Sequence, residues 1–310
     1  MTLRKRFYTA DVFTDHIFGG NPLAVVPDAT GLSDTQMQRI AREFSLSETA
    51  FVFPPESDDH TRRLRIFTPG TELPFAGHPT IGTAHVLAAI GEIALPGEVT
   101  SVIFEEGVGP VRVRIQGDEE HPVSAELAAP QLPKIGPEHP PTEQIAAVLS
   151  LNPAELRNDS YAPQAVSCGV PFLFVPLRDQ EALARAHVDR TRWKEHIASY
   201  WAPHLYCLAF DPDRPRSNLR ARMFAPAMGI DEDPATGAAA TALAGYLAAR
   251  SEIRSGAARW TIEQGVEMGR PSTLQVEADL ADGVVEAIRV GGASVIVSEG
   301  VIEIPDVIPD

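Results

Sequence analysis

Three polar residues of this sequence could do acid–base chemistry: Glu48, His78 and Asp233. Glu48 lies where a predicted helix gives way to a β-branched and aromatic run at residues 49–53. A carboxylate in such an apolar setting is expected to be partly desolvated, which raises its pKa and suits it to pass protons near neutrality. The alternative for Glu48 is a solvated side chain at the start of a strand.

His78 and Asp233 each precede a proline, and the segments that follow, residues 79–90 and 234–249, carry no charged side chain. A helix that is apolar all round must be buried, and a membrane crossing needs about 20 apolar residues. Both segments are therefore predicted to be central helices of a soluble protein. Because proline suits the first helical position, His78 and Asp233 are expected at the N-caps, where aspartate is favoured and histidine is not.

The starts of these two helices could bind an anion. A helix N-terminus offers unpaired N–H groups and the positive end of the helix dipole. Two such ends that face each other would hold a carboxylate or a similar group. The alternative is that a capping residue and a proline only start each helix.

Motifs of the first half of the chain return in the second half, in the same order. The matching pieces are Gly20-Asn21-Pro22-Leu23 with Gly169-Val170-Pro171-Phe172, Arg65-Ile66-Phe67-Thr68-Pro69 with Arg222-Met223-Phe224-Ala225-Pro226, and His78-Pro79-Thr80-Ile81-Gly82 with Asp233-Pro234-Ala235-Thr236-Gly237. A proline-rich stretch at residues 130–141 reads as the linker between them. We expect two similar halves, residues 1–130 and 131–310, with a last strand over about 295–310 that pairs back onto the first half.

Composition excludes several classes of function. The net charge of −16 argues against nucleic acid or an anionic membrane surface as a partner, because both attract basic patches. The two cysteines, Cys168 and Cys207, make no disulfide framework and match no zinc pattern, so a reducing cytoplasm is expected and both are interpreted as small buried hydrophobic residues. His78 and His85 could share a helix face, but nothing completes a ligand set, so no metal site is predicted.

Two further elements bear on the site. Ser33 to Gln36 form a capping box, and apolar residues at helical spacing follow it, which predicts a helix over about residues 34–44 that ends shortly before Glu48. Asn21 lies in a glycine-rich turn. It either closes that turn through its own backbone or contacts a substrate.

Taken together, five motifs resemble the PhzF-like isomerase family of phenazine biosynthesis. They are Gly20-Asn21-Pro22, Leu46-Ser47-Glu48-Thr49-Ala50, Phe67-Thr68-Pro69, Phe75-Ala76-Gly77-His78-Pro79-Thr80 and Asp231-Glu232-Asp233-Pro234-Ala235-Thr236-Gly237. The resemblance covers nearly the whole chain. It implies the α+β fold of diaminopimelate epimerase, with two pseudo-symmetric halves, each a mixed sheet curled, or closed into a barrel, around a central buried helix, and an active site in the cleft between them.

The resemblance also implies an activity and roles for particular residues. Members of this family are generally cofactor-independent, often homodimeric, and act on small carboxylate-bearing molecules. Glu48 matches the glutamate that moves a proton between carbon atoms, and His78 and Asp233 match residues that position the substrate and assist the transfer. The candidate substrate-binding residues are Asn21, Ser47, Gly77, Gly82, Gly237 and Ala238.

One position departs from the family pattern. The phenazine-pathway enzymes have serine after the Thr-Gly pair, whereas this chain has Ala238. A hydroxyl contact is therefore missing, which argues for a different substrate. A binding or interaction protein that kept the fold and lost the chemistry is the second hypothesis, since fold does not fix function. The presence of Glu48, His78 and Asp233 together favours the enzyme.

Overall fold

The computed structural model describes residues 2–118, 121–210 and 219–305. They form two compact units. Unit 1 comprises the described residues up to Ala128 and those from Gly291 onward, and unit 2 comprises Ala129–Val290. Of the strand expected over about 295–310, residues 306–310 lie outside the described residues.

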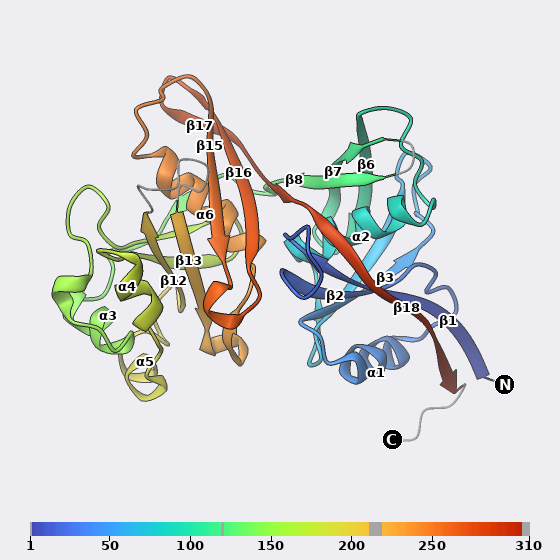
Figure 1. The fold of residues 1–310 in the computed structure, drawn as a ribbon, viewed down its shortest axis with the longest axis horizontal. Helices are drawn as coiled ribbons and strands as arrows, with labels where there is room; N and C mark the ends of the chain where they lie inside the picture. The colour runs from blue at the N-terminus through green and yellow to red at the C-terminus, as the bar shows by residue number, and fades with distance from the viewer. Residues whose placement is uncertain (1, 119–120, 211–218, 306–310) are drawn as a thin grey trace. The chain divides into compact units, whose positions relative to one another are not determined.

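Unit 1 is a curled sheet with one helix inside it and one outside it (Figure 1). Its elements are β1 Thr2–Val12, β2 Asn21–Val26, α1 Asp34–Phe44, β3 Glu48–Phe53, β4 Arg62–Phe67, β5 Glu72–Leu73, α2 Gly77–Ala89, β6 Val99–Glu106, β7 Gly109–Gly117, β8 Pro122–Ala128 and β18 Ser294–Pro305. The last strand, β18, pairs antiparallel with β1 along its whole length.

Unit 2 repeats this arrangement and adds helices on the outside of its sheet. Its elements are β9 Lys134–Ile135, α3 Thr142–Val148, β10 Gln164–Ser167, β11 Pro171–Pro176, α4 Gln180–Arg185, α5 Arg190–His196, β12 His204–Phe210, β13 Leu219–Ala225, β14 Ile230–Asp233, α6 Gly237–Ala248, β15 Gly256–Gln264, β16 Ser272–Ala281 and most of β17 Val284–Gly292. Short 3-10 turns lie at Pro153–Glu155, Pro226–Met228 and Val266–Met268.

The strand pairings follow the same order in the two units. In unit 1, β1–β2 is antiparallel, β2–β3 parallel, β3–β4 antiparallel, β4–β6 parallel and β6–β7 antiparallel. In unit 2, β10–β11, β11–β12, β12–β13, β13–β15 and β15–β16 run in the same senses. Each sheet is therefore mixed and curls around its helix, which confirms the predicted fold class, although the sheets remain open rather than closing into barrels.

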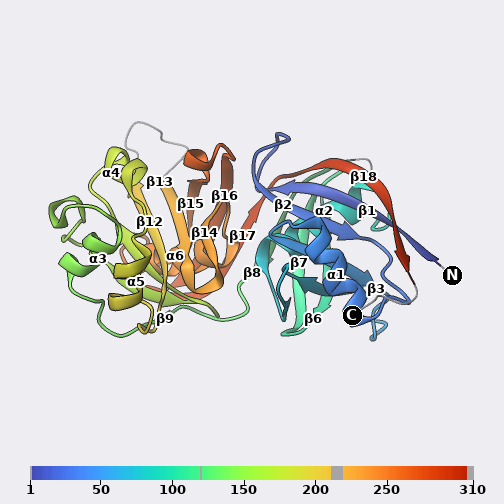
Figure 2. The same cartoon turned by 90° about the horizontal axis from the view of Figure 1, so that it is seen from below.

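The two central helices are buried as their uncharged sequences predict. Helix α2 lies against β1, β2, β3, β7, β8 and β18, and α6 lies against β10, β11, β15 and β16 (Figure 2). Every residue of α2 from Gly77 to Ala88 is buried, and in α6 only Ala238 is not. Because neither helix has a polar face, enclosure by a sheet is the arrangement that removes both from water.

Helix α1 covers the outer face of the unit 1 sheet. It has the predicted bounds and the predicted capping box, in which the Ser33 hydroxyl accepts from the Gln36 N–H and the Gln36 side chain accepts from the Ser33 N–H. Met37, Ile40 and Ala41 pack against the sheet. The helix ends at Ser45, so the chain reaches the start of β3 after a short bend.

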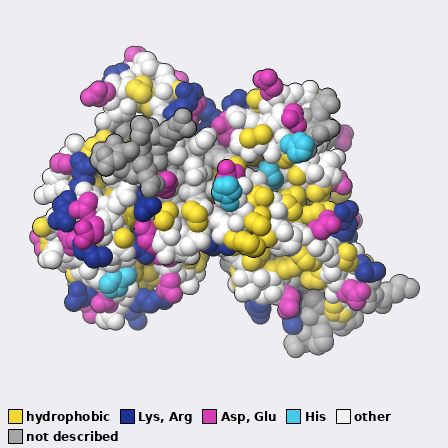
Figure 3. Space-filling view, in the orientation of Figure 1, with side chains coloured by type: hydrophobic (Ala, Val, Ile, Leu, Met, Phe, Trp, Pro, Cys, Tyr) yellow, Lys and Arg dark blue, Asp and Glu magenta, His cyan; other side chains and the backbone are white. Residues whose placement is uncertain are grey.

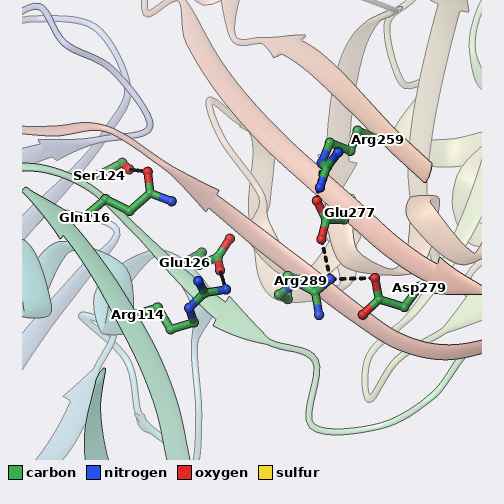
Figure 4. A network of polar contacts seen from close by, with 8 residues as sticks. All are labelled: Arg114, Gln116, Ser124, Glu126, Arg259, Glu277, Asp279 and Arg289. Atoms are coloured by element: carbon green, nitrogen blue, oxygen red, sulfur yellow. Dashed lines mark hydrogen bonds and ion pairs between the residues drawn. The ribbon is translucent and has the colours of Figure 1, made fainter. Parts of the chain in front are cut away.

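Polar side chains on the strands form ion pairs within each unit (Figure 4). In unit 2, Arg289 of β17 bonds both Glu277 and Asp279 of β16, with 2.7 Å between its Nη2 and the Asp279 Oδ1. In unit 1, Arg114 of β7 donates to Glu126 of β8 over 2.7 Å. On the face drawn in Figure 3, Lys and Arg side chains are interspersed with Asp and Glu side chains rather than gathered in one patch.

None of the helices within the described ranges is both long enough and apolar enough to cross a membrane.

Candidate active site

Helix α2 starts earlier than predicted, and this places His78 inside it. Its first residue is Gly77, and its N-cap is Ala76, which offers no side-chain hydrogen bond. The Thr80 N–H donates to the Ala76 carbonyl over 3.3 Å and so closes the first turn. The expectation that His78 is the N-cap is therefore wrong. Pro79 is tolerated at the third position because no helical bond needs its missing N–H there.

His78 and Glu48 meet in unit 1. The His78 Nε2 lies 3.1 Å from the Glu48 Oε2, and the two side chains are only 8% and 14% exposed. Glu48 is the first residue of β3 and lies in register beside Leu23 of β2. Because α2 packs against both strands, the imidazole in its first turn reaches the carboxyl group at the strand start.

Burial determines the protonation of His78. It lowers the pKa of this imidazole to about 3, although a hydrogen bond with the Pro22 backbone acts in the opposite direction. Proline has no N–H, so the ring donates this bond to the Pro22 carbonyl. The Nε2 of a neutral ring that donates through its other nitrogen is an acceptor. The 3.1 Å contact places this nitrogen beside the Glu48 carboxyl group.

Three predicted substrate-binding residues lie next to this pair along the chain. Asn21 is buried at the start of β2, directly before Pro22. Ser47 is half-buried in the bend before Glu48, and Gly77 is the buried first residue of α2. The structure thus brings Asn21, Ser47 and Gly77 close to Glu48 and His78, because each adjoins a residue that contacts or forms this pair.

Gly82 is explained by packing. It lies inside α2, beyond the first turn, where a helix uses its N–H groups for its own bonds. A Cβ atom at Gly82 would lie 2.5 Å from the Val12 Cγ2 and 2.6 Å from the Leu23 Cδ2. Its lack of a side chain lets α2 approach the sheet. Its position beyond the first turn leaves it no spare N–H group with which to bind an anion.

In unit 2, the central helix starts later than predicted. Helix α6 begins at Gly237 with Thr236 as its N-cap, so the expectation that Asp233 is the N-cap is wrong. Asp233 is the last residue of β14. Its carboxylate accepts a hydrogen bond from the Thr236 hydroxyl, and its backbone carbonyl accepts from the Gln264 Nε2 over 2.8 Å. Ala238 is half-buried in the first turn of α6.

An arginine–glutamate pair precedes the central helix in both units. In unit 1, the Arg65 Nε and Nη2 each lie 2.7 Å from an oxygen of Glu72. In unit 2, the Arg222 Nε and Nη2 each lie 2.8 Å from an oxygen of Glu232. Both pairs are bidentate, which fixes the geometry of the guanidinium and the carboxylate.

A glycine packed on a proline is the second shared feature. A Cβ at Gly107, which follows β6, would lie 2.7 Å from the Pro74 Cα. A Cβ at Gly265, which follows β15, would lie 2.6 Å from the Pro234 carbonyl oxygen. Each proline precedes a central helix, so these contacts tie the same two segments together in each unit.

The arginine–glutamate pairs and the glycine–proline contacts show which residues of the two units are equivalent, and this match differs from the one that the repeated motifs suggested. Counted back from Gly77 and Gly237, the ion-paired glutamates and the packed prolines fall at equal distances from the two helices. The residue that matches His78 is therefore Ala238. The residue that matches Asp233 is Leu73, so the His-Pro and Asp-Pro motifs are not equivalent in the structure.

Both cysteines are confirmed as free and buried. Burial raises the pKa of the Cys168 thiol to about 12, and burial also raises the pKa of Cys207. Thiols that stay protonated are poor bases and nucleophiles.

His85 is also buried, which lowers its pKa to about 4. Among the described residues, no three His, Cys, Asp or Glu side chains gather closely enough to hold a metal ion.

The sequence reasoning missed two residues that touch the starts of the central helices. Glu106 ends β6 and contacts Thr80 of α2, and Gln264 ends β15 and contacts Thr236, the N-cap of α6. The motif Glu106-Gly107 and its match Gln264-Gly265 could have revealed them. Sequence alone does not show that these side chains point inward, because each lies at the end of a strand.

Solved structures share this fold. A Bacillus anthracis phenazine biosynthesis protein of the PhzF family superposes with a TM-score of 0.86 at 24% identity, covering 97% of this chain and 99% of that chain. A hydroxyproline epimerase from Agrobacterium vitis superposes with a TM-score of 0.63 at 14% identity, covering 97% and 92%. At these identities, the likeness shows the fold alone.

Sequence relatives define the class more closely. An uncharacterized isomerase of Mesorhizobium japonicum is 40% identical over 303 residues, which cover 96% of this chain and 98% of that protein. The trans-2,3-dihydro-3-hydroxyanthranilate isomerase of Pseudomonas aeruginosa is 35% identical over 295 residues, which cover 95% and 98%. The protein is therefore an enzyme of the isomerase class.

Residues 10–300 match the family described as phenazine biosynthesis-like protein, and the chain belongs to that family. The resemblance noted from its motifs is confirmed.

Proposed function

We propose that this isomerase moves a proton between carbon atoms of a small carboxylate-bearing substrate, with Glu48 as the single acid and base and without a cofactor. The observation that supports the proposal best is the 3.1 Å contact between Glu48 and His78 in a buried setting. General acid–base catalysis needs a carboxyl group that can both take and return a proton, and a partner that holds it in place.

His78 is proposed to position the Glu48 carboxyl group and the substrate and so to assist the transfer, while the proton itself is carried by Glu48. A neutral imidazole is suited to this role because its Nε2 is a hydrogen-bond acceptor when the other ring nitrogen donates to Pro22. Asp233, with its carboxylate held by the Thr236 hydroxyl, is proposed to assist substrate positioning. Asn21 and Ser47 are proposed as substrate contacts.

The substrate carboxylate is proposed to bind backbone N–H groups at the start of a central helix. Ala76 and Thr236 cap these helices without a side-chain hydrogen bond, which leaves first-turn donors at Gly77 and Gly237 for a ligand. Removal of a proton next to a carboxylate builds negative charge, and preorganised donors stabilise it.

The substrate class is proposed to include cyclic carboxylates related to the dihydro-hydroxyanthranilate named for the Pseudomonas aeruginosa relative. Ala238 offers no hydroxyl in the first turn of α6, which supports a different member of this class. We further propose an internally duplicated chain that acts as a homodimer. A monomeric mass by light scattering in solution would contradict the dimer.

Substitution of Glu48 tests the central assignment. Glu48→Gln keeps the size of the side chain and removes its acid–base function, so turnover should fall at least roughly 100-fold. The assay follows product formation and deuterium uptake from heavy water for trans-2,3-dihydro-3-hydroxyanthranilate and a panel of small carboxylates. The control is Glu43→Gln, at an exposed glutamate of α1. Full turnover by E48Q would show that another group moves the proton.

A binding or interaction protein is the second candidate, and Ala238 is the observation that favours it. In that case a carboxylate would bind to the wild type and to E48Q with equal affinity, and neither protein would convert it. Calorimetric titration of the same panel separates this outcome from an isomerase whose substrate is absent from the panel, because only a binding protein would retain a ligand unchanged.

A further inference from the structure

Glu106 is a buried carboxyl group that the proposed reaction does not use. It is the last residue of β6 and is 9% exposed. Its Oε1 lies 2.7 Å from the hydroxyl oxygen of Thr80, in the first turn of α2. The same hydroxyl oxygen lies 2.8 Å from the Ala76 carbonyl. Glu106 therefore joins the end of β6 to the turn that carries His78.

Both of these contacts can be hydrogen bonds at once only if Glu106 is protonated. A threonine hydroxyl has one hydrogen and can donate to one acceptor at a time. Threonines inside helices commonly donate to the carbonyl four residues earlier, which here is Ala76. The contact between Thr80 and Glu106 then needs a second hydrogen, which a protonated carboxyl group supplies. With an ionised Glu106, the hydroxyl would donate to the carboxylate, and the Ala76 carbonyl would keep only the Thr80 N–H at 3.3 Å.

The other carboxyl oxygen supports the same conclusion. Among the described residues, the Oε2 of Glu106 is buried without a hydrogen-bond partner. An ionised carboxylate with one oxygen in this state would bear a large desolvation penalty, whereas a neutral carboxyl group bears a much smaller one.

Unit 2 carries a neutral side chain of similar shape at the matched position. Gln264 ends β15, and its Nε2 donates to the Asp233 carbonyl over 2.8 Å and to the Thr236 hydroxyl oxygen over 3.1 Å. A glutamine donates through its amide, and a glutamic acid can donate in the same way only when it is protonated. In both units, the side chain at this strand end is hydrogen-bonded to the start of the central helix.

We propose that Glu106 is a protonated carboxylic acid in the folded protein, and that its donated hydrogen bond to Thr80 positions the first turn of α2 and the His78 imidazole. Glu106 is a positioning residue, since it touches the helix that carries the acid–base pair rather than the pair itself. The effect on catalysis rests on the proposed function, whereas the protonation of Glu106 does not.

Burial is the physical cause of this protonation. It raises the pKa of Glu106 to about 8, and the contact with Thr80 only partly opposes the effect. The imidazoles of α2 titrate in a different range, because burial lowers the pKa of His78 to about 3 and that of His85 to about 4.

Other charged groups line a groove of about 570 Å³ that Glu106 also lines. They belong to β4, β5, β6 and the loop before β4, and they are Glu56, His60, Arg63, Arg65, Glu72 and Glu105. They form ion pairs with partners other than Glu106: Arg65 with Glu72, Arg63 with Glu56, and His60 with Glu105. His60 is the imidazole of this group, and the measurement is repeated in a His60→Gln background, which lacks it.

The pH dependence of unfolding tests the proposal. A carboxyl group whose pKa rises from 4.5 to about 8 on folding stabilises the protein below pH 4.5, and this contribution is lost as the pH rises toward 8. Glu106→Gln keeps a donor and cannot ionise. From about pH 5 to about pH 8, E106Q should gain stability relative to the wild type, by up to about tenfold in the unfolding constant per pH unit.

Glu105→Gln is the matched control at the neighbouring residue. The Glu105 carboxylate accepts from the Glu56 and Ser57 N–H groups and contacts His60, and these bonds hold its pKa below the usual value. The stability of E105Q relative to the wild type should therefore fall as the pH rises toward about 4.5, and it should stay constant from about pH 5 to about pH 8, where E106Q gains stability. A stability difference between E106Q and the wild type that does not change with pH would overturn the proposal.

Two further measurements keep the proposal testable if E106Q folds poorly. In wild-type protein with carbon-13-labelled glutamate, the Glu106 carboxyl resonance should titrate near pH 8, and a midpoint near pH 4.5 would overturn the proposal. In the isomerase assay, wild-type turnover should fall above about pH 8. E106Q should lack this decrease, because glutamine cannot ionise. Glu106→Leu, which has no hydrogen-bond donor, should lower turnover at every pH. If the resonance titrates near pH 8 but no turnover is seen, the result counts against the proposed function and not against the protonation of Glu106. The resonance reports protonation independently of catalysis.

Discussion

The first turns of α2 and α6 have the same supports and different chemistry. Each helix begins at a glycine and follows a bidentate arginine–glutamate pair, and its start is hydrogen-bonded to the side chain at the end of a strand. The second residue of α2 is His78, whereas that of α6 is Ala238. The scaffold is thus repeated, and the imidazole is not.

The strands beside the two helices differ in the same way. Glu48 begins β3 next to Leu23, and His204 begins β12 next to Phe172, in equivalent parallel pairings. A carboxyl group therefore meets an imidazole in unit 1, while unit 2 has a buried histidine at the position of the carboxyl group. The comparison teaches that one copy of a repeated fold can hold the proposed acid–base pair while the other has only the surrounding strands and helix.

Removal of the imidazole should have the largest effect. His78→Ala gives α2 the residue that α6 has at the matched position. Turnover should fall about 10²–10⁴-fold, because Glu48 loses the imidazole that positions its carboxyl group. The measurement is the turnover number of the purified variant under saturating substrate. The control is His187→Ala, at an exposed histidine of unit 2. If H78A kept wild-type turnover, the contrast between the two units would carry no catalytic meaning.

The arginine–glutamate pairs should differ in their contribution to stability. The Arg222 and Glu232 side chains are 9% and 15% exposed, and the Arg222 Nη1 also donates to the Leu183, Ala184 and Ala186 carbonyls. Arg222→Met leaves these buried groups without a partner and should cost about 3–5 kcal/mol of unfolding free energy.

Arg65→Met is the matched change in unit 1. The Arg65 and Glu72 side chains are 23% and 41% exposed, so solvent screens the pair, and the loss should stay within about 1 kcal/mol. Both losses are measured by urea denaturation. Equal losses in the two variants would mean that the two pairs support their helices to the same degree.

Gly82→Ala tests the close approach of α2 to its sheet. The matched residue of α6 is Ala242, which shows that a Cβ is accommodated at this position in unit 2. In unit 1 the added methyl would overlap Val12 and Leu23, and overpacking of this kind costs about 1–3 kcal/mol. Gly97→Ala, where no atom lies within 4 Å of the added Cβ, should change stability by less than about 0.5 kcal/mol. Equal denaturation midpoints for G82A and G97A would contradict the packing role.

Local patterns predicted the elements well and their starts poorly. The capping box at Ser33 fixed the first residue of α1, because both of its hydrogen bonds join residues three apart in sequence. The starts of α2 and α6 carry no such side-chain cap. The His78-Pro79 and Asp233-Pro234 motifs therefore suggested N-caps at His78 and Asp233 that the structure does not have.

The mismatch between the motifs has a structural cause. In unit 2, a 3-10 turn at Pro226–Met228 lengthens the connection between β13 and the segment before α6. The residues that precede the helix are shifted accordingly, so Asp233 ends a strand and His78 lies within a helix. A repeat of letters does not reveal such a shift, because the register follows from contacts with distant strands.

The sequence by itself determined which segments had to leave water. Residues 79–90 and 234–249 have no charged side chain, so each had to be enclosed, and the repeated order of motifs made two similar units the simplest solution. Tertiary structure alone decided which polar side chains went inside with them. The contact of Glu48 with His78 and the burial of Glu106 depend on strand register and on the depth of each side chain, and both are set by packing between residues far apart in the chain.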